Sequence, residues 1–244
     1  MSISTESSAS HPTAPATNAS PHLARLEERL PPLLSVIAGM VDVIGFISLK
    51  LFTAHITGNL VVIAALLVRG GPPNLTQILA VPMFMIAVAA VWMIAKVSPR
   101  RGPALARPLL LVQFLLLLCL LIFSVLFDPA ANPRGFIAGV AAMIAVWSMA
   151  CQFALLRLAL PVAPSTAVMT GNLTTTVLVA LDTLSPRHPF MRDAEVRLKE
   201  TVKLVVGFTA GCVAGAAAVT WLGDWAWSVP VMLAGVAVFE PASS

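Results

Sequence analysis

The triplet Thr57-Gly58-Asn59 occurs twice in this chain, because Thr170-Gly171-Asn172 repeats it 113 positions further on. Threonine can cap a helix, glycine lets the backbone approach a ligand or another helix, and asparagine both donates and accepts hydrogen bonds. A helix that begins at such a triplet inside a membrane leaves free N–H groups. Two interpretations follow: the triplets form a binding site, or they only allow two short helices to touch.

Asp42 is the acidic residue that lies deepest in an apolar run. A carboxyl group at that depth costs several kcal/mol unless it is paired, protonated or facing water. Gln152 occupies the corresponding place in the second half, 18 residues before the second triplet where Asp42 lies 15 before the first. Asp42 is therefore either part of a substrate or proton site that includes Gln152, or a structural partner of His55, Arg157 or a helix N-terminus.

His55 precedes the first triplet by two residues and is a pH-sensitive partner for Asp42 in either interpretation. No second histidine stands at metal-ligand spacing, and the three cysteines lie singly in apolar runs, so we expect no metal and no cofactor. The chain has no HExxH motif and no Ser/His nucleophile motif. An intramembrane aspartyl protease needs two apposed carboxylates, whereas Asp182 lies at the end of its segment. We therefore expect no catalytic residues and no enzyme.

The composition places these residues in a membrane. Hydrophobic residues make up 58% of the chain and charged residues 11%, with a mean hydropathy of +0.91. A soluble protein has about a quarter charged residues. We therefore expect an all-α polytopic protein whose partner is the lipid bilayer, and the net charge of +4 then carries topology information and does not indicate binding to nucleic acid.

The apolar residues fall into eight segments, four in each half: 33–51, 56–68, 77–97, 108–127, 135–160, 163–184, 204–222 and 225–239. Residues 1–30 are predicted to be a disordered tail and a short lead-in helix, which Pro31-Pro32 ends. Residues 31–128 then form the first membrane repeat and residues 129–240 the second. Glycine pairs at Gly135-x-x-x-Gly139 and Gly211-x-x-x-Gly215 are predicted helix contacts.

The distribution of lysine and arginine decides how many segments cross. If all eight crossed with the N-terminus inside, six of the 15 Lys and Arg residues would lie outside. If the two segments with the triplets enter and leave by one face, only Lys50, Arg69 and Arg134 lie outside. The second arrangement is favoured, and it has six full crossings plus two re-entrant or short broken helices in two inverted repeats. Segment 163–184 is nevertheless long enough to span.

The chain resembles the YoaK family of small bacterial inner-membrane proteins, which contain a domain of unknown function. The resemblance covers roughly residues 33 to 222 and depends on two motif regions, which are Gly39-x-x-Asp42-x-x-Gly45-Phe46 with His55-x-Thr57-Gly58-Asn59, and Cys151-Gln152 with residues 165–172. It implies a multi-pass protein of the bacterial cytoplasmic membrane, without a settled activity.

The leading functional hypothesis is a permease for a small solute, with or without coupled protons. Its midplane site is predicted to comprise Asp42, His55, Thr57, Gly58, Asn59, Gln152, Thr170, Gly171 and Asn172. Duplication, broken segments and an intramembrane carboxyl group support it. The chain is short for a single-chain transporter, which favours a homodimer. The alternative is a non-catalytic membrane scaffold or accessory subunit, in which Asp42 is simply paired.

Overall fold

A computed structural model describes residues 21–70, 74–161, 163–166, 168–184 and 194–239. Every regular element in these ranges is helical, so the fold is all-α as predicted. The α-helices are α1 (Pro21–Leu49), α2 (Ile56–Arg69), α3 (Leu75–Val97), α4 (Ala106–Phe127), α5 (Phe136–Ala159), α6 (Met169–Leu184), α7 (Ala194–Leu222) and α8 (Ser228–Phe239), with short 3-10 helices at Gly102–Leu105 (η1), Pro129–Ala131 (η2) and Gly223–Trp227 (η3).

Five segments within the described ranges are long and apolar enough to cross a membrane. They are Glu28–Leu49, Leu75–Val97, Gly102–Phe127, Phe136–Ala159 and Glu195–Phe239, and the last contains α7, η3 and α8. This confirms an all-α membrane protein. A sixth crossing depends on α8, whose 12 residues span about 18 Å, so the exact number of crossings stays a prediction.

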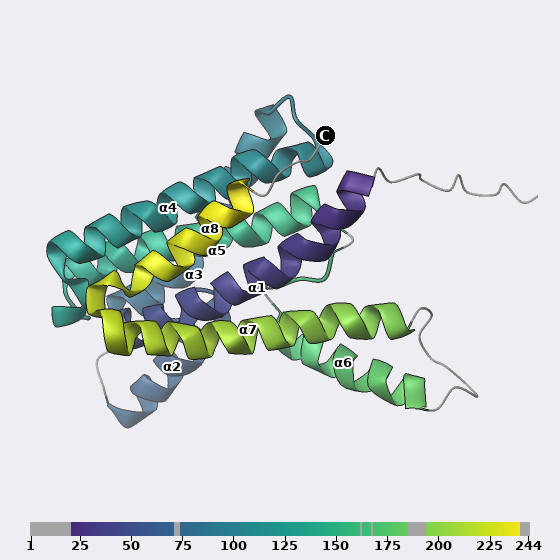
Figure 1. The fold of residues 1–244 in the computed structure, drawn as a ribbon. Helices are drawn as coiled ribbons and strands as arrows, with labels where there is room; N and C mark the ends of the chain where they lie inside the picture. The colour runs from purple at the N-terminus through teal and green to yellow at the C-terminus, as the bar shows by residue number, and fades with distance from the viewer. Residues whose placement is uncertain (1–20, 71–73, 162, 167, 185–193, 240–244) are drawn as a thin grey trace, which may run out of the picture.

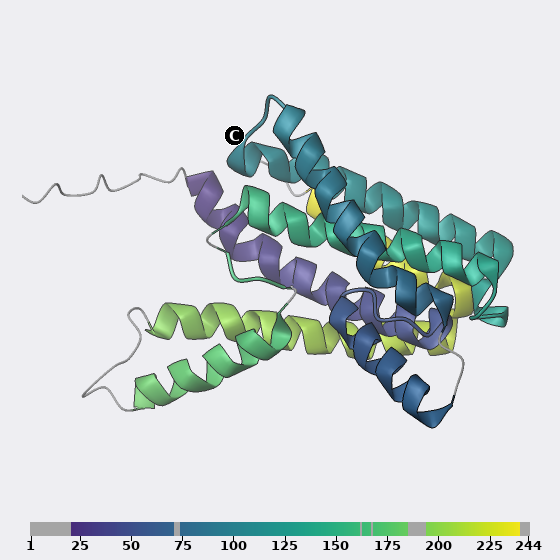
Figure 2. The same cartoon turned by 180° about the vertical axis from the view of Figure 1, so that it is seen from behind.

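Helices α2 and α6 each begin partway along the bundle and run out to one end of it (Figure 1). Helix α2 runs toward the end of the bundle at which α1 ends. Helix α6 runs toward the opposite end, at which α1 begins, and the view from behind agrees (Figure 2). The two short helices therefore point in opposite directions, as inverted repeats require. Segment 163–184 is not one spanning helix, because α6 begins only at Met169 and its 16 residues cover about 24 Å.

The prediction that Pro31-Pro32 ends a separate lead-in helix is wrong. Helix α1 runs unbroken from Pro21 to Leu49 with both prolines inside it. A proline removes one N–H group from the helix ladder, and the carbonyl groups it deprives lie four residues earlier. Here those carbonyls belong to residues 27 and 28, at the charged end of the spanning segment, where water can hydrate them. The predicted tail, residues 1–20, lies outside the described residues.

The contacts between helices occur in matched pairs. Helix α1 packs on α7 and α5 packs on α3; α5 packs on α4 and α1 on α8; α2 packs on α3 and α6 on α7. The pairs correspond when α1, α2, α3 and α4 are matched with α5, α6, α7 and α8 in that order. The first helix of each half thus packs on the third helix of the other half. The two repeats are therefore interlocked in the structure, and α1 and α5 are the most buried of the spanning helices.

Helices α1 and α7 approach closely along a row of glycines, which we call the glycine seam: Gly207, Gly211 and Gly215. A Cβ atom on Gly211 would overlap the Val36 carbonyl oxygen, and one on Gly215 would lie 3.0 Å from the Met40 carbonyl oxygen. This confirms the predicted contact at Gly211 and Gly215. The prediction is wrong for Gly135, which precedes α5. Gly139 does face α3, but a Cβ atom there would lie 3.5 Å from Thr76 Oγ1, an ordinary contact, so this position does not require glycine.

The glycine seam predicts the effect of a single methyl group. Gly211→Ala places a Cβ atom against the backbone of Val36, which cannot move without shifting α1, so we expect a loss of about 1–3 kcal/mol. Gly139→Ala is the matched control, since the new Cβ atom fits, and its effect should stay within about 0.5 kcal/mol. Thermal unfolding in detergent, followed by tryptophan fluorescence, measures both. Equal melting temperatures for the two variants would contradict the seam.

Candidate functional site

The chain turns back into the bundle immediately after α1. Lys50 adopts a left-handed backbone conformation with φ of 56°, which reverses the chain direction at the end of the helix. Gly45 makes room for the returning chain, because a Cβ atom there would lie 2.7 Å from Thr53 Cγ2 and 3.2 Å from the Leu51 carbonyl oxygen. Residues 50–55, which we call the return loop, therefore run back along α1 before α2 begins.

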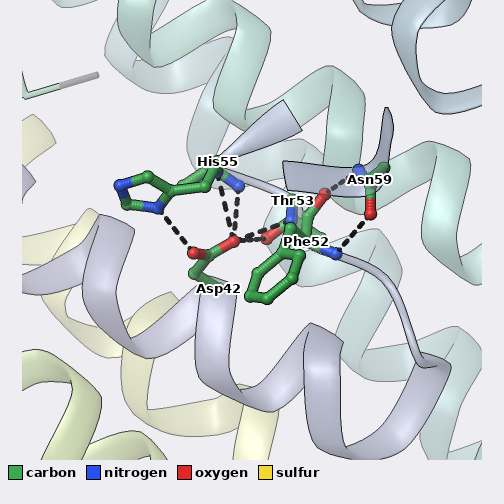
Figure 3. A network of polar contacts seen from close by, with 6 residues as sticks. Asp42, Phe52, Thr53, His55 and Asn59 are labelled. Atoms are coloured by element: carbon green, nitrogen blue, oxygen red, sulfur yellow. Dashed lines mark hydrogen bonds and ion pairs between the residues drawn. The ribbon is translucent and has the colours of Figure 1, made fainter. Parts of the chain in front are cut away.

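The carboxylate of Asp42 holds the return loop (Figure 3). Its Oδ1 atom accepts hydrogen bonds from the backbone N–H groups of Thr53 and Ala54, both at 2.8 Å, and of His55 at 3.3 Å. These groups precede α2, so they would have no partner in the helix. Asp42 is buried, with 5% of its surface exposed. The donors that converge on Oδ1 offset the cost of burying the carboxylate.

His55 occupies the other oxygen of the same carboxylate. Its Nδ1 atom lies 2.7 Å from Asp42 Oδ2, within hydrogen-bonding distance. The imidazole ring packs edge-on against Phe208 of α7 at 5.1 Å between centroids. The His55 side chain is 34% exposed, whereas that of Asp42 is only 7% exposed. The ring is thus the part of this pair that a proton or a small molecule can reach from outside.

Asn59, the last residue of the first triplet, closes the return loop from the α2 side. Its Oδ1 atom accepts from the Phe52 N–H group at 3.0 Å, and its Nδ2 atom donates to the Phe52 carbonyl oxygen at 2.8 Å. The amide therefore pairs with both polar groups of one backbone residue, as a neighbouring β-strand would. The adjacent Gly58 leaves room for the Phe52 ring, which would lie 3.1 Å from a Cβ atom. Figure 3 shows both contacts of Asn59.

The second triplet is held in a related way. Asn172 Nδ2 donates to the Ser165 carbonyl oxygen at 2.7 Å, seven residues back, which is the same separation as between Asn59 and Phe52. Gln152 Nε2 lies 3.4 Å from Thr166 Oγ1, four residues before the triplet. Thr53 stands at that same position in the first half, where its hydroxyl group lies 3.5 Å from Asp42 Oδ1. Gln152 is thus the structural counterpart of Asp42.

Gln152 also takes part in a separate buried network. Its Nε2 atom donates to the Leu34 carbonyl oxygen at 2.9 Å, and Gln113 Nε2 donates to Gln152 Oε1 at 2.7 Å. Leu34 and Asp42 are eight residues apart on α1, or about 12 Å along the helix. The structure therefore holds the two triplets with two sets of contacts, centred on Asp42 and on Gln152. A substrate site that joins them stays a prediction.

The predicted site residues differ in what they expose. Asn59 and Asn172 are buried and Gly58 is half-buried, whereas Thr57, Thr170 and Gly171 are exposed. Sequence reasoning did not single out Phe52, Thr53 or Thr166. Its available signal was a threonine four residues before each triplet. Within the described ranges no three His, Cys, Asp or Glu side chains are grouped to hold a metal ion.

These features define an integral membrane protein with two short helices that point in opposite directions and whose starts are fixed by buried polar side chains. The family model of the protein of unknown function DUF1275 matches residues 30–239. The chain therefore belongs to the DUF1275 family. No curated protein and no solved structure is significantly similar to it.

The donors around Asp42 predict a graded response to substitution. Asp42→Leu leaves the N–H groups of Thr53 and Ala54 without an acceptor, at about 1–3 kcal/mol each. Asp42→Asn keeps one acceptor oxygen and should lose less than half as much. Hydrogen exchange of the return loop measures this, and Asp42→Leu should exchange at least about tenfold faster than wild type. Unchanged exchange in Asp42→Leu would show that the carboxylate does not hold the loop.

Proposed function

We propose that the protein is a small-solute permease of the bacterial cytoplasmic membrane, with its N-terminus in the cytoplasm and its substrate site at the inner ends of α2 and α6. The main observation in support is that two short helices begin partway through an all-helical membrane bundle and run to opposite ends of it. Broken helices of this kind bring helix N-termini and free backbone groups to the bilayer midplane, which is where inverted-repeat transporters bind their substrates. The proposal includes no catalytic step.

The exposed members of the triplets are the groups offered to a solute. Asn59 and Asn172 bond the chain's own backbone, and Asp42 is occupied by the return loop. Thr57 and Thr170, which carry hydroxyl groups, are exposed residues at the start of their helices. Hydroxyl and backbone groups favour a small polar solute over a strongly charged one. In this proposal the asparagines position the site and the threonines contact the substrate.

The pair of Asp42 and His55 supports coupling to protons. Their atoms lie 2.7 Å apart, and the half-buried imidazole ring is accessible enough to gain or lose a proton. A change in the protonation of His55 would alter the hold of Asp42 on the return loop, and hence the position of Thr57. This is the link through which proton and solute binding would affect each other.

One observation favours the alternative of a non-catalytic scaffold or accessory subunit. Both oxygens of Asp42 already have partners within the chain, as a purely structural carboxylate would. In that case the pair of Asp42 and His55 only fixes the fold. The two functions differ in whether the purified protein makes a membrane permeable.

Osmotic swelling of proteoliposomes tests the proposal without knowledge of the substrate. Glycerol, urea, alanine and acetate serve as probes, stopped-flow light scattering reports their entry, and trapped pyranine reports proton movement. We expect faster entry than in protein-free liposomes for at least one solute. The double variant Thr57→Val and Thr170→Val should lower that rate about tenfold, because each loses a hydrogen bond to the solute.

Thr174→Val is the matched control, since this exposed hydroxyl group donates to the Thr170 carbonyl oxygen within α6 and should leave the entry rate unchanged. Thermal unfolding of each variant establishes that it folds. Entry at the protein-free rate for all four solutes, with no proton movement, would contradict a permease and favour the scaffold.

A further inference from the structure

An apolar groove opens beside α5, away from the triplets. Its volume is about 650 Å³, within the range of small-molecule sites. Helix α5 lines it along one face from Gly135 to Trp147, and the first turns of α3 form another wall. Its side chains are overwhelmingly apolar, and none of the nine predicted substrate-site residues lines it. Arg134 stands at the end of the groove where α5 begins.

The groove lies beside the pair formed by α5 and α3, whose counterpart in the other half, α1 and α7, packs closely. The contact between α5 and α3 is the counterpart of the contact between α1 and α7, and both pairs are parallel (Figure 1). The glycine seam brings α7 against the middle of α1, at Pro32, Val36 and Met40. Helix α3 contains no glycine, and its first turns, with Thr76 facing Gly139, form a wall of the groove beside α5. The two matched helix pairs therefore differ, because α1 and α7 pack closely along glycines, whereas a groove opens beside α5 and α3.

The dimensions and charge of the groove fit one kind of occupant. From Phe136 to Trp147 the groove follows about 17 Å of α5, close to the thickness of one lipid leaflet, which is about 15 Å of hydrocarbon. Arg134 is exposed at the end of the groove that lies at the bundle's end. A guanidinium group there matches a phosphate in charge and geometry. A long apolar channel with a cation at its outer end fits an acyl chain attached to an anionic headgroup.

We propose that this groove is a binding site for an anionic phospholipid. One acyl chain lies along α5 against Met143 and Trp147, and the phosphate bonds Arg134. The Thr76 hydroxyl group, across from Gly139, supplies a second polar contact near the headgroup end. The site is separate from the proposed substrate site and does not depend on transport.

Native mass spectrometry of the full-length protein tests the proposal. Phosphatidylglycerol and phosphatidylcholine with identical acyl chains are titrated into the detergent-solubilised protein. We expect wild type to retain phosphatidylglycerol in preference to phosphatidylcholine. Arg134→Gln should weaken phosphatidylglycerol binding about tenfold, because a charge-assisted hydrogen bond is lost, and should abolish the preference. Arg134 is exposed, so this substitution should leave folding intact.

Arg69→Gln is the matched control, because Arg69 is an exposed cation at the same end of the bundle that does not line the groove. It should leave the preference unchanged. Gly139→Leu should fill the groove and weaken both lipids. The proposal is overturned if wild type binds the two lipids equally, or if Arg69→Gln weakens phosphatidylglycerol as much as Arg134→Gln does.

Discussion

The backbone N–H groups of the return loop impose the main constraint on this structure. A chain that re-enters an apolar bundle carries donors that lipid cannot satisfy, and each unsatisfied group costs several kcal/mol. Asp42 accepts from Thr53, Ala54 and His55 at once. Its own burial would be equally unfavourable without those donors. The buried carboxylate and the buried N–H groups thus satisfy each other, and this pairing allows α2 to begin inside the bundle.

The second half holds the segment before its short helix without a charge, through side-chain amide groups that donate hydrogen bonds. Gln152 reaches Thr166, and Asn172 bonds the backbone seven residues back, as Asn59 does. The two halves therefore share their geometry but differ electrostatically, since only the α2 side places a carboxylate and an imidazole before its helix. The same divergence appears in packing, where the glycine seam between α1 and α7 corresponds to a groove between α3 and α5. The proposed proton-coupled pair and the proposed lipid groove both lie where the two halves differ.

Hydropathy and the positions of lysine and arginine were enough to predict an all-helical membrane protein with two inverted short helices. They did not predict that α6 begins at Met169, although Pro161 and Pro164 were a signal, because proline disfavours helix in the preceding residue. The repeated triplet indicated that Asn59 and Asn172 have a role, but it did not indicate their hydrogen-bond partners. Those partners are backbone groups, which any residue type can supply. Pro31 and Pro32 misled for a related reason, because the effect of a proline depends on whether the freed carbonyl groups meet water.

Labelling of single cysteines from each side of the membrane tests the central claim most directly. In a background with Cys119, Cys151 and Cys212 replaced by alanine, Lys50→Cys and Arg69→Cys mark the two ends of the segment that contains the return loop and α2. The account predicts that a membrane-impermeant maleimide reaches both from one face, and reaches Arg100→Cys only from the other. Labelling of positions 50 and 69 from opposite faces would show that α2 crosses the membrane, and would contradict the inverted arrangement.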